Sequence, residues 1–200
     1  MDFTVTIVTR NRAESLKEGL RSLIAQAYPS DRYEVIVVDN GSTDHTRDVA
    51  EYMAGDFNHF QYLFDLRPGQ LVGWHRALQV AKGSIACFID DDVRPETTWL
   101  AGLASSYEDP NVGLATGPIS LEFEADRPAW LDHMELGNPG GMTLPLLGLL
   151  DYGSTAREIP SNFVWGSNFS ARRSLIMKVG GFHPCAMPGD LLHFYGDGEI

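Results

Sequence analysis

The chain has 200 residues, of which 44% are hydrophobic and 10% aromatic, which is enough for one sizeable apolar core and excludes an intrinsically disordered chain. Its formal net charge of −12 at pH 7 argues against the broad basic face with which proteins track nucleic acid or anionic membranes. Nucleic acid is therefore not an expected partner, and an anionic ligand would need a metal ion or local hydrogen-bond donors.

Strand and helix patterns alternate along the first half of the chain. An apolar run at 3–9 predicts a first strand, and Leu16, Leu20 and Leu23 then recur at helical spacing. The next elements are expected in the order strand 33–38, helix from a cap at Ser42 or Thr43 to about 52, strand 60–64, helix 71–81 and strand 85–89. Strands that alternate with helices predict an α/β fold with a mostly parallel sheet flanked by helices.

The second half carries a weaker pattern. We expect a helix at 99–107 and a strand at 112–121, followed by irregular Pro- and Gly-rich chain at 126–160. A long irregular stretch in a compact domain commonly builds or covers a binding site. Regular structure is expected again at 163–170, and then a helix at 172–179 that Gly180 and Gly181 would end.

We expect a cytoplasmic protein, because Met1 and Asp2 lead directly into the first apolar run without the pattern of a secretory leader. The longest apolar run near the middle, at 144–150, is too short and too broken by Pro145 and Gly148 to span a bilayer. It either packs inside or lies on a surface, so peripheral attachment at the inner membrane face stays open.

Three consecutive aspartates, Asp90, Asp91 and Asp92, follow the apolar run at 85–89. In open α/β sheets the ligand crevice lies beyond the carboxyl ends of the strands. Adjacent carboxylates repel one another, and Mg²⁺ or Mn²⁺ prefers oxygen ligands from carboxylates and phosphates. The aspartates therefore predict a site where a hard cation meets a polyanion; an acidic loop facing water is the alternative.

Polar residues also end the first two strands. Asp39 could accept hydrogen bonds from a base or ribose, or it could form the turn with Asn40 and Gly41. Residues 9–12 (Thr-Arg-Asn-Arg) offer donors to the same crevice, or they form a plain polar loop. Neither a Gly-rich dinucleotide fingerprint nor a P-loop occurs, so a carboxylate-bound metal ion is the remaining way to hold phosphate.

Five segments in this order resemble family 2 glycosyltransferases of the GT-A fold: 6–12, 35–44, 81–92, 166–173 and 180–182. The resemblance implies a GT-A-type (Rossmann-like) sheet with a smaller mixed region on the acceptor side. It also implies transfer of a sugar from a nucleotide-diphosphate donor, usually a UDP-sugar, to an acceptor hydroxyl with inversion, and a divalent cation, Mn²⁺ or Mg²⁺. The acceptor would be a carbohydrate or a lipid-linked molecule.

The resemblance further implies roles for the residues at matching positions. Asp197, in the acidic segment 196–199, would be the general base. Asp92 would bind the metal ion with help from Asp90. The nucleotide would be bound by the strand-end group Thr9, Asn11, Glu14, Asp39 and Asp91. The single domain would divide into a nucleotide-binding half at 1–117 and an acceptor-facing half at 118–200, truncated at its C-terminal end.

One segment departs from the family pattern. Residues 73–75 (Gly-Trp-His) stand where the family often has Ala-Arg-Asn, so that His75 or Arg76 would have to replace an expected polar donor. Two other functions stay open. A sugar-nucleotide pyrophosphorylase shares the alternating fold, although 9–12 lacks the Gly-rich loop of that class, and a non-catalytic nucleotide-sugar-binding module would hold the donor without turnover.

Overall fold

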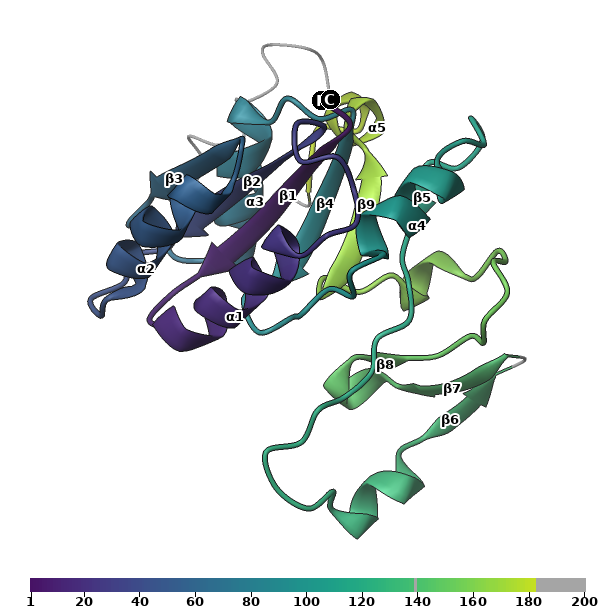
Figure 1. Cartoon of the computed structure of the whole chain (residues 1–200). Helices are drawn as coiled ribbons and strands as arrows, with labels where there is room; N and C mark the ends of the chain where they lie inside the picture. Colours follow the sequence, from purple (N-terminus) through teal and green to yellow (C-terminus); the bar gives the residue numbers. More distant parts are fainter. Residues whose placement is uncertain (139, 183–200) are drawn as a thin grey trace.

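The computed structural model describes residues 1–138 and 140–182. Within them, the main sheet has the spatial order β3-β2-β1-β4-β9-β5 (Figure 1). Its strands are β1 (Phe3–Thr9), β2 (Tyr33–Asp39), β3 (Phe60–Phe64), β4 (Ile85–Asp90), β5 (Leu114–Ala115) and β9 (Asn168–Arg172). The pairs among β1 to β4 are parallel, and β9 is antiparallel to both its neighbours. The expected α/β fold with a mostly parallel sheet is confirmed.

Helices cover both faces of this sheet. One face packs against α1 (Ala13–Ile24), α2 (Thr46–Met53) and α4 (Trp99–Ser106), and the other against α3 (Gln70–Val80) and α5 (Arg173–Lys178). Successive residues of a strand point to opposite faces of the sheet. A strand that is apolar at consecutive positions therefore presents apolar side chains to the helices on both faces. In β2, for example, Val35 and Val37 join the core of the first face, and Ile36 and Val38 join that of the second.

The first half of the chain forms as expected, with one difference at α2. This helix begins at Thr46, whose backbone N–H donates a hydrogen bond of 3.0 Å to Asp44 Oδ1 in the turn before the helix. The expected caps, Ser42 and Thr43, bond instead to the loop after β1. Asn11 donates its backbone N–H to Ser42 Oγ (2.8 Å) and accepts the Thr43 N–H on Oδ1 (2.7 Å). The 3-10 turn η1 (Ala54–Asp56) follows α2.

The second half departs further from expectation. The strand expected at 112–121 is only two residues long, β5, since Thr116 leaves the sheet and Pro118 has no N–H to donate. Ile119 instead makes an isolated bridge to Leu150. Within 163–170, where regular structure was expected, the 3-10 turn η4 (Ser161–Phe163) ends at Phe163 and β9 begins at Asn168. β9 then extends to Arg172.

The stretch at 126–160 is not irregular throughout, which corrects the sequence expectation. It contains a three-stranded antiparallel sheet in the order β6-β7-β8, with strands β6 (Leu136–Asn138), β7 (Gly141–Leu144) and β8 (Leu149–Leu150), and the 3-10 turns η2 (Ala129–His133) and η3 (Pro145–Leu147). Strands of two to four residues carry too few alternations to be recognised in sequence. Figure 1 shows this small sheet on the side of the molecule toward which β4 runs.

The connections of the main sheet create a switch point between β1 and β4. From β1 the chain builds β2 and β3 on one side, and then crosses to place β4 on the other side of β1. The loops that leave β1 and β4 therefore run in opposite directions and leave a crevice between them. Val8 is paired with Asp90, so the first aspartate of the triplet lies at the edge of this crevice.

Candidate functional site

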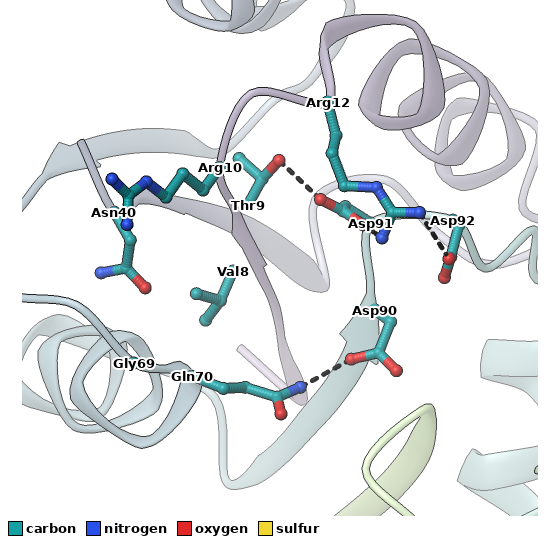
Figure 2. Close-up of a pocket in the computed structure, with 10 residues that line it drawn as sticks. All are labelled: Val8, Thr9, Arg10, Arg12, Asn40, Gly69, Gln70, Asp90, Asp91 and Asp92. Atoms are coloured by element: carbon teal, nitrogen blue, oxygen red, sulfur yellow. Dashed lines mark hydrogen bonds and ion pairs between the residues drawn. The ribbon is translucent and has the colours of Figure 1, made fainter. Parts of the chain in front are cut away.

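A cleft of about 340 Å³ opens at this switch point (Figure 2). Its walls come from the end of β1, the turn after β2, the start of α3 and the end of β4. It is lined by Val8, Thr9, Arg10, Arg12, Asn40, Gly69, Gln70, Asp90, Asp91 and Asp92. The structure thus brings together Thr9 and all three aspartates of the predicted site.

Asp91 is the best anchored of the aspartates. It is buried, and its Oδ2 accepts a hydrogen bond of 2.7 Å from the hydroxyl of Thr9. Its Oδ1 lies 3.1 Å from Nη1 of Arg12. Burial raises the pKa of Asp91 above its ordinary value, although the hydrogen bond from Thr9 and the charge of Arg12 oppose this effect. The first strand and the loop after it therefore fix this carboxylate in the wall of the cleft.

Asp92 and Asp90 project to different sides of Asp91. Asp92 is half exposed, and its Oδ2 lies 3.1 Å from Nη2 of Arg12. Asp90 Oδ1 accepts a hydrogen bond of 2.6 Å from the side-chain amide of Gln70, at the start of α3. Burial, and then the charges of Asp92 and Asp91, raise the pKa of Asp90. Asp90 is thus a largely buried carboxylate with two further carboxylates beside it.

The cleft offers suitable donors for a divalent cation. In residues 1–138 and 140–182, no three His, Cys, Asp or Glu side chains converge as a ready metal site. Asp90 and Asp92 nevertheless supply the hard carboxylate oxygens that Mn²⁺ and Mg²⁺ prefer, and with Asp91 they place three carboxylates in the lining of one cleft, whose mutual repulsion a cation would offset. The residues present therefore fit such an ion.

The other three predicted nucleotide-binding residues do not line the cleft. Asp39 is fully buried and accepts hydrogen bonds from the Tyr62 hydroxyl (2.6 Å) and from the Ser42 backbone N–H (2.7 Å). Asn11, in a left-handed conformation with φ of 54°, joins the loops after β1 and β2. Glu14 is exposed on α1, where its hydrogen bond with His45 is the first cause of its lowered pKa. Their roles toward a nucleotide stay predictions.

Residues 73–76 do not supply the polar donor expected from α3. Gly73 and Trp74 are packed inside, and His75 Nε2 accepts the Phe182 backbone N–H at 3.0 Å. Arg76 Nε lies 3.3 Å from Asp65 at the end of β3. The group that α3 contributes to the cleft is Gln70, which sequence reasoning missed because its position is set by the loop before the helix.

Asp197, the predicted general base, lies outside the described residues. Two tryptophans of the second half differ in exposure: Trp130 is 54% exposed, whereas Trp165 is partly buried and donates its Nε1–H to the Asn162 carbonyl at 3.2 Å. Among the helices of the described segments, none is both long and apolar enough to cross a membrane.

The sequence profile of the family described as Glycosyl transferase family 2 matches residues 4–180. The chain therefore belongs to this family, as its five motifs predicted. It is 30% identical over 121 residues to glycosyltransferase AglE of Haloferax volcanii, covering 60% of this chain and 40% of AglE. It is also 30% identical over 187 residues to the uncharacterized glycosyltransferase YibD of Escherichia coli K12, covering 90% of this chain and 52% of YibD. The chain thus spans about half the length of these relatives, or less.

Solved structures share the fold. S. aureus TarS (1–349) in complex with UDP superposes with a TM-score of 0.71 at 19% identity, covering 98% of this chain and 54% of TarS. Mannosyltransferase PcManGT from Pyrobaculum calidifontis, in complex with GDP-Man and Mn²⁺, superposes with a TM-score of 0.66 at 24% identity, covering 96% of this chain and 50% of PcManGT. The expected GT-A-type fold is confirmed.

Proposed function

We propose that this chain binds the donor in a metal-dependent, inverting glycosyltransferase that moves a sugar from a UDP-sugar to a hydroxyl of a carbohydrate or lipid-linked acceptor. The observation that carries the proposal is the cleft between β1 and β4, where three consecutive aspartates face the polar loop after β1. Ligands bind at such switch points in open α/β sheets. The family membership and the nucleotide-bound structures of the same fold support the proposal.

In this proposal the nucleotide lies along the ends of β1 and β2. Thr9 and Asp91 form the wall beside the ribose, and Asn11 and Asp39 hold the loops that receive the base. Glu14 completes the group from the first turn of α1. The two solved structures of this fold hold different nucleotides, UDP in one and GDP-Man in the other. The fold therefore does not determine the base, and the choice of uridine is part of the proposal.

Asp92 and Asp90 would hold the cation, which supplies charge neutralisation for the departing diphosphate when it is bound. Asp197 would take the proton of the acceptor hydroxyl as that oxygen attacks the anomeric carbon. Attack from the face opposite to the leaving nucleoside diphosphate inverts the configuration. The acceptor side would be formed by the half of the chain after residue 117, in a cytoplasmic protein.

Nucleotide binding tests the donor and metal assignments together. Calorimetry with UDP and Mn²⁺ should show binding that weakens by about tenfold or more when EDTA removes the cation, because the diphosphate charge is then left without its counterion. Asp92→Asn should weaken UDP binding with Mn²⁺ present by a similar factor. Asp48→Asn, which removes an exposed carboxylate from α2, is the control and should bind as wild type does.

The outcomes separate the assignments. Equal affinity for UDP with and without EDTA contradicts metal dependence. Tighter binding of GDP than of UDP contradicts the uridine assignment alone. A chain that binds UDP and Mn²⁺ but releases no sugar to any hydroxyl acceptor supports a non-catalytic binding module instead.

The base is tested by Asp197→Asn, which keeps the shape of the side chain but accepts no proton. A general base contributes about 10²–10⁴-fold, so the transfer rate should fall by that factor while UDP affinity stays within about twofold of wild type. Retention of more than about a third of the rate would assign the proton transfer to another group, and Glu199 would be the next residue to change.

A further inference from the structure

The guanidinium of Arg12 lies between two aspartates of the cleft (Figure 2). Nη1 is 3.1 Å from Asp91 Oδ1, and Nη2 is 3.1 Å from Asp92 Oδ2. A planar guanidinium can bond two separate carboxylates through its two terminal nitrogens, which an ammonium group does less well. Arg12, which directly precedes α1, therefore couples the two carboxylates to each other and to the start of that helix.

The two contacts differ in strength. The Asp91 side chain is only 6% exposed and is also held by Thr9, so this half of the bridge is anchored in the wall. The side chains of Arg12 and Asp92 are 51% and 52% exposed. An ion pair exposed to that degree is weak in water and opens readily. The Asp92 contact is thus the part of the bridge that can be exchanged.

This exchange matters for a cation. While Arg12 holds Asp92, one oxygen of the predicted metal ligand is occupied, and a positive charge stands beside the place where a cation would bind. A diphosphate supplies the guanidinium with another anion, and Arg forms the same charge-assisted, bidentate hydrogen bonds with phosphate oxygens as with carboxylates. Release of Asp92 and binding of the diphosphate therefore favour each other.

We propose that Arg12 is a positioning residue that blocks Asp92 until a diphosphate arrives, so that cation and nucleotide bind cooperatively. The proposal rests on the proposed function, since it assumes a nucleoside diphosphate and a divalent cation in this cleft. Arg12 stays on Asp91, turns its exposed donors to the diphosphate and frees Asp92 for the cation. The cation alone binds weakly, and the nucleotide raises its affinity by the same factor by which the cation raises that of the nucleotide.

Arg10 provides a matched control. It leaves the same strand two residues earlier and also lines the cleft, but Figure 2 shows its side chain directed toward Asn40, away from the aspartates. Replacing either arginine by Gln removes the same charge from the same loop. Only the change at Arg12 removes the bridge between Asp91 and Asp92.

The experiment measures Mn²⁺ binding without nucleotide, from the loss of the free Mn²⁺ signal in electron paramagnetic resonance, and UDP binding at saturating Mn²⁺ by calorimetry. Arg12→Gln should bind Mn²⁺ alone about fivefold more tightly, since a repelling charge and a competitor are gone, and should bind UDP about tenfold more weakly. Arg10→Gln should change the affinity for Mn²⁺ alone by less than about twofold. Arg12→Lys keeps the charge and should fall between wild type and Arg12→Gln in both measurements.

Opposite shifts in the two affinities support the bridge. Unchanged or weaker Mn²⁺ binding by Arg12→Gln would overturn the proposal. An equal gain in Mn²⁺ affinity in Arg10→Gln would also overturn it, because the effect would then come from net charge alone. Thermal melting of each variant verifies that it is folded. If Arg12→Gln is not folded, the comparison is made with Arg12→Lys instead. If wild type binds Mn²⁺ and UDP but Arg12→Gln matches it, only the role of Arg12 fails. If wild type binds neither, the proposed function fails with it.

Discussion

At the scale of single residues, the predicted nucleotide-binding group divides into two kinds. Thr9 and Asp91 bond to each other across the ends of β1 and β4, in the wall of the cleft. Asp39, which looked equivalent in sequence, has its two oxygens bonded to Tyr62 and Ser42 and is fully buried. Its loss would leave two polar groups without an acceptor, so a change at Asp39 affects stability as well as any ligand.

Asp90→Asn should separate stability from function. The pKa of Asp90 is raised in the folded state, by burial first, so the folded chain keeps this proton to a higher pH than the unfolded chain does. The resulting stabilisation is present below the unfolded value near 3.8 and is lost as the pH rises through the folded pKa. The neutral amide avoids that loss, so at pH 7 the variant should melt about 2 °C or more above wild type.

Thermal denaturation at several pH values checks this expectation. The difference between Asp90→Asn and wild type should narrow as the pH falls from 7 toward 4. The same variant should bind Mn²⁺ more weakly, because it lacks one of the two carboxylates that the proposed function assigns to the cation. A difference in melting temperature that does not change with pH would contradict the raised pKa.

At the scale of elements, α3 packs unusually close to β1. A Cβ atom placed on Gly73 would lie 2.4 Å from Cγ2 of Val8, a distance that no real contact allows. The absence of a side chain at Gly73 thus lets α3 approach the strand and brings Gln70, one turn earlier, to the edge of the cleft. The glycine at position 73, where the family often has Ala, therefore has a packing reason.

Gly73→Ala should destabilise the chain by about 1–3 kcal/mol, because the added methyl overpacks the contact with Val8. Gly102 in α4 is the matched control. An added Cβ there meets nothing within 4 Å, so Gly102→Ala should stabilise by about 0.5–1 kcal/mol through the lower backbone entropy of Ala. Chemical denaturation measures both changes. Val8→Ala should recover part of the loss in Gly73→Ala, and a failure to do so would place the strain elsewhere.

At the scale of the whole molecule, β9 brings the chain back to the main sheet after the small sheet of β6, β7 and β8. It inserts between β4 and β5, antiparallel to both. Arg172, at its end, donates from Nε to the Val112 carbonyl (2.8 Å) and from Nη2 to those of Asp109 (2.9 Å) and Tyr107 (3.1 Å). One side chain thereby ties the returning strand to the loop between α4 and β5.

Arg172→Met should lower the free energy of unfolding by about 1–3 kcal/mol, because three carbonyls lose their donor while the apolar stem is kept. Arg173→Met is the control, since Arg173 makes one such bond, from Nε to the Gly83 carbonyl (3.0 Å). Its cost in urea denaturation should be smaller, by at least a factor of two. Equal costs for the two variants would show that the hydrogen bonds of Arg172 do not hold the loop.

The sequence alone determined the elements whose pattern is local. The apolar runs of β1, β2 and β4 and the helical spacing of Leu16, Leu20 and Leu23 predict their structure, since each pattern repeats within its own segment. It also placed the aspartates at a strand end, because the end of an apolar run marks where the chain leaves the sheet. Five ordered motifs were enough to identify the family.

Only the tertiary structure decided what depends on contacts between distant segments. The place of β9 in the sheet, the short strands at 136–150 and the buried hydrogen bonds of Asp39 arise from pairing across the chain, which no local period encodes. The same holds for the cleft, where Gln70 and Arg12 contact the aspartates 20 and 80 residues away in sequence. Sequence names the residue types that chemistry requires, but the strand order determines which of them meet, because side chains interact through distances in space.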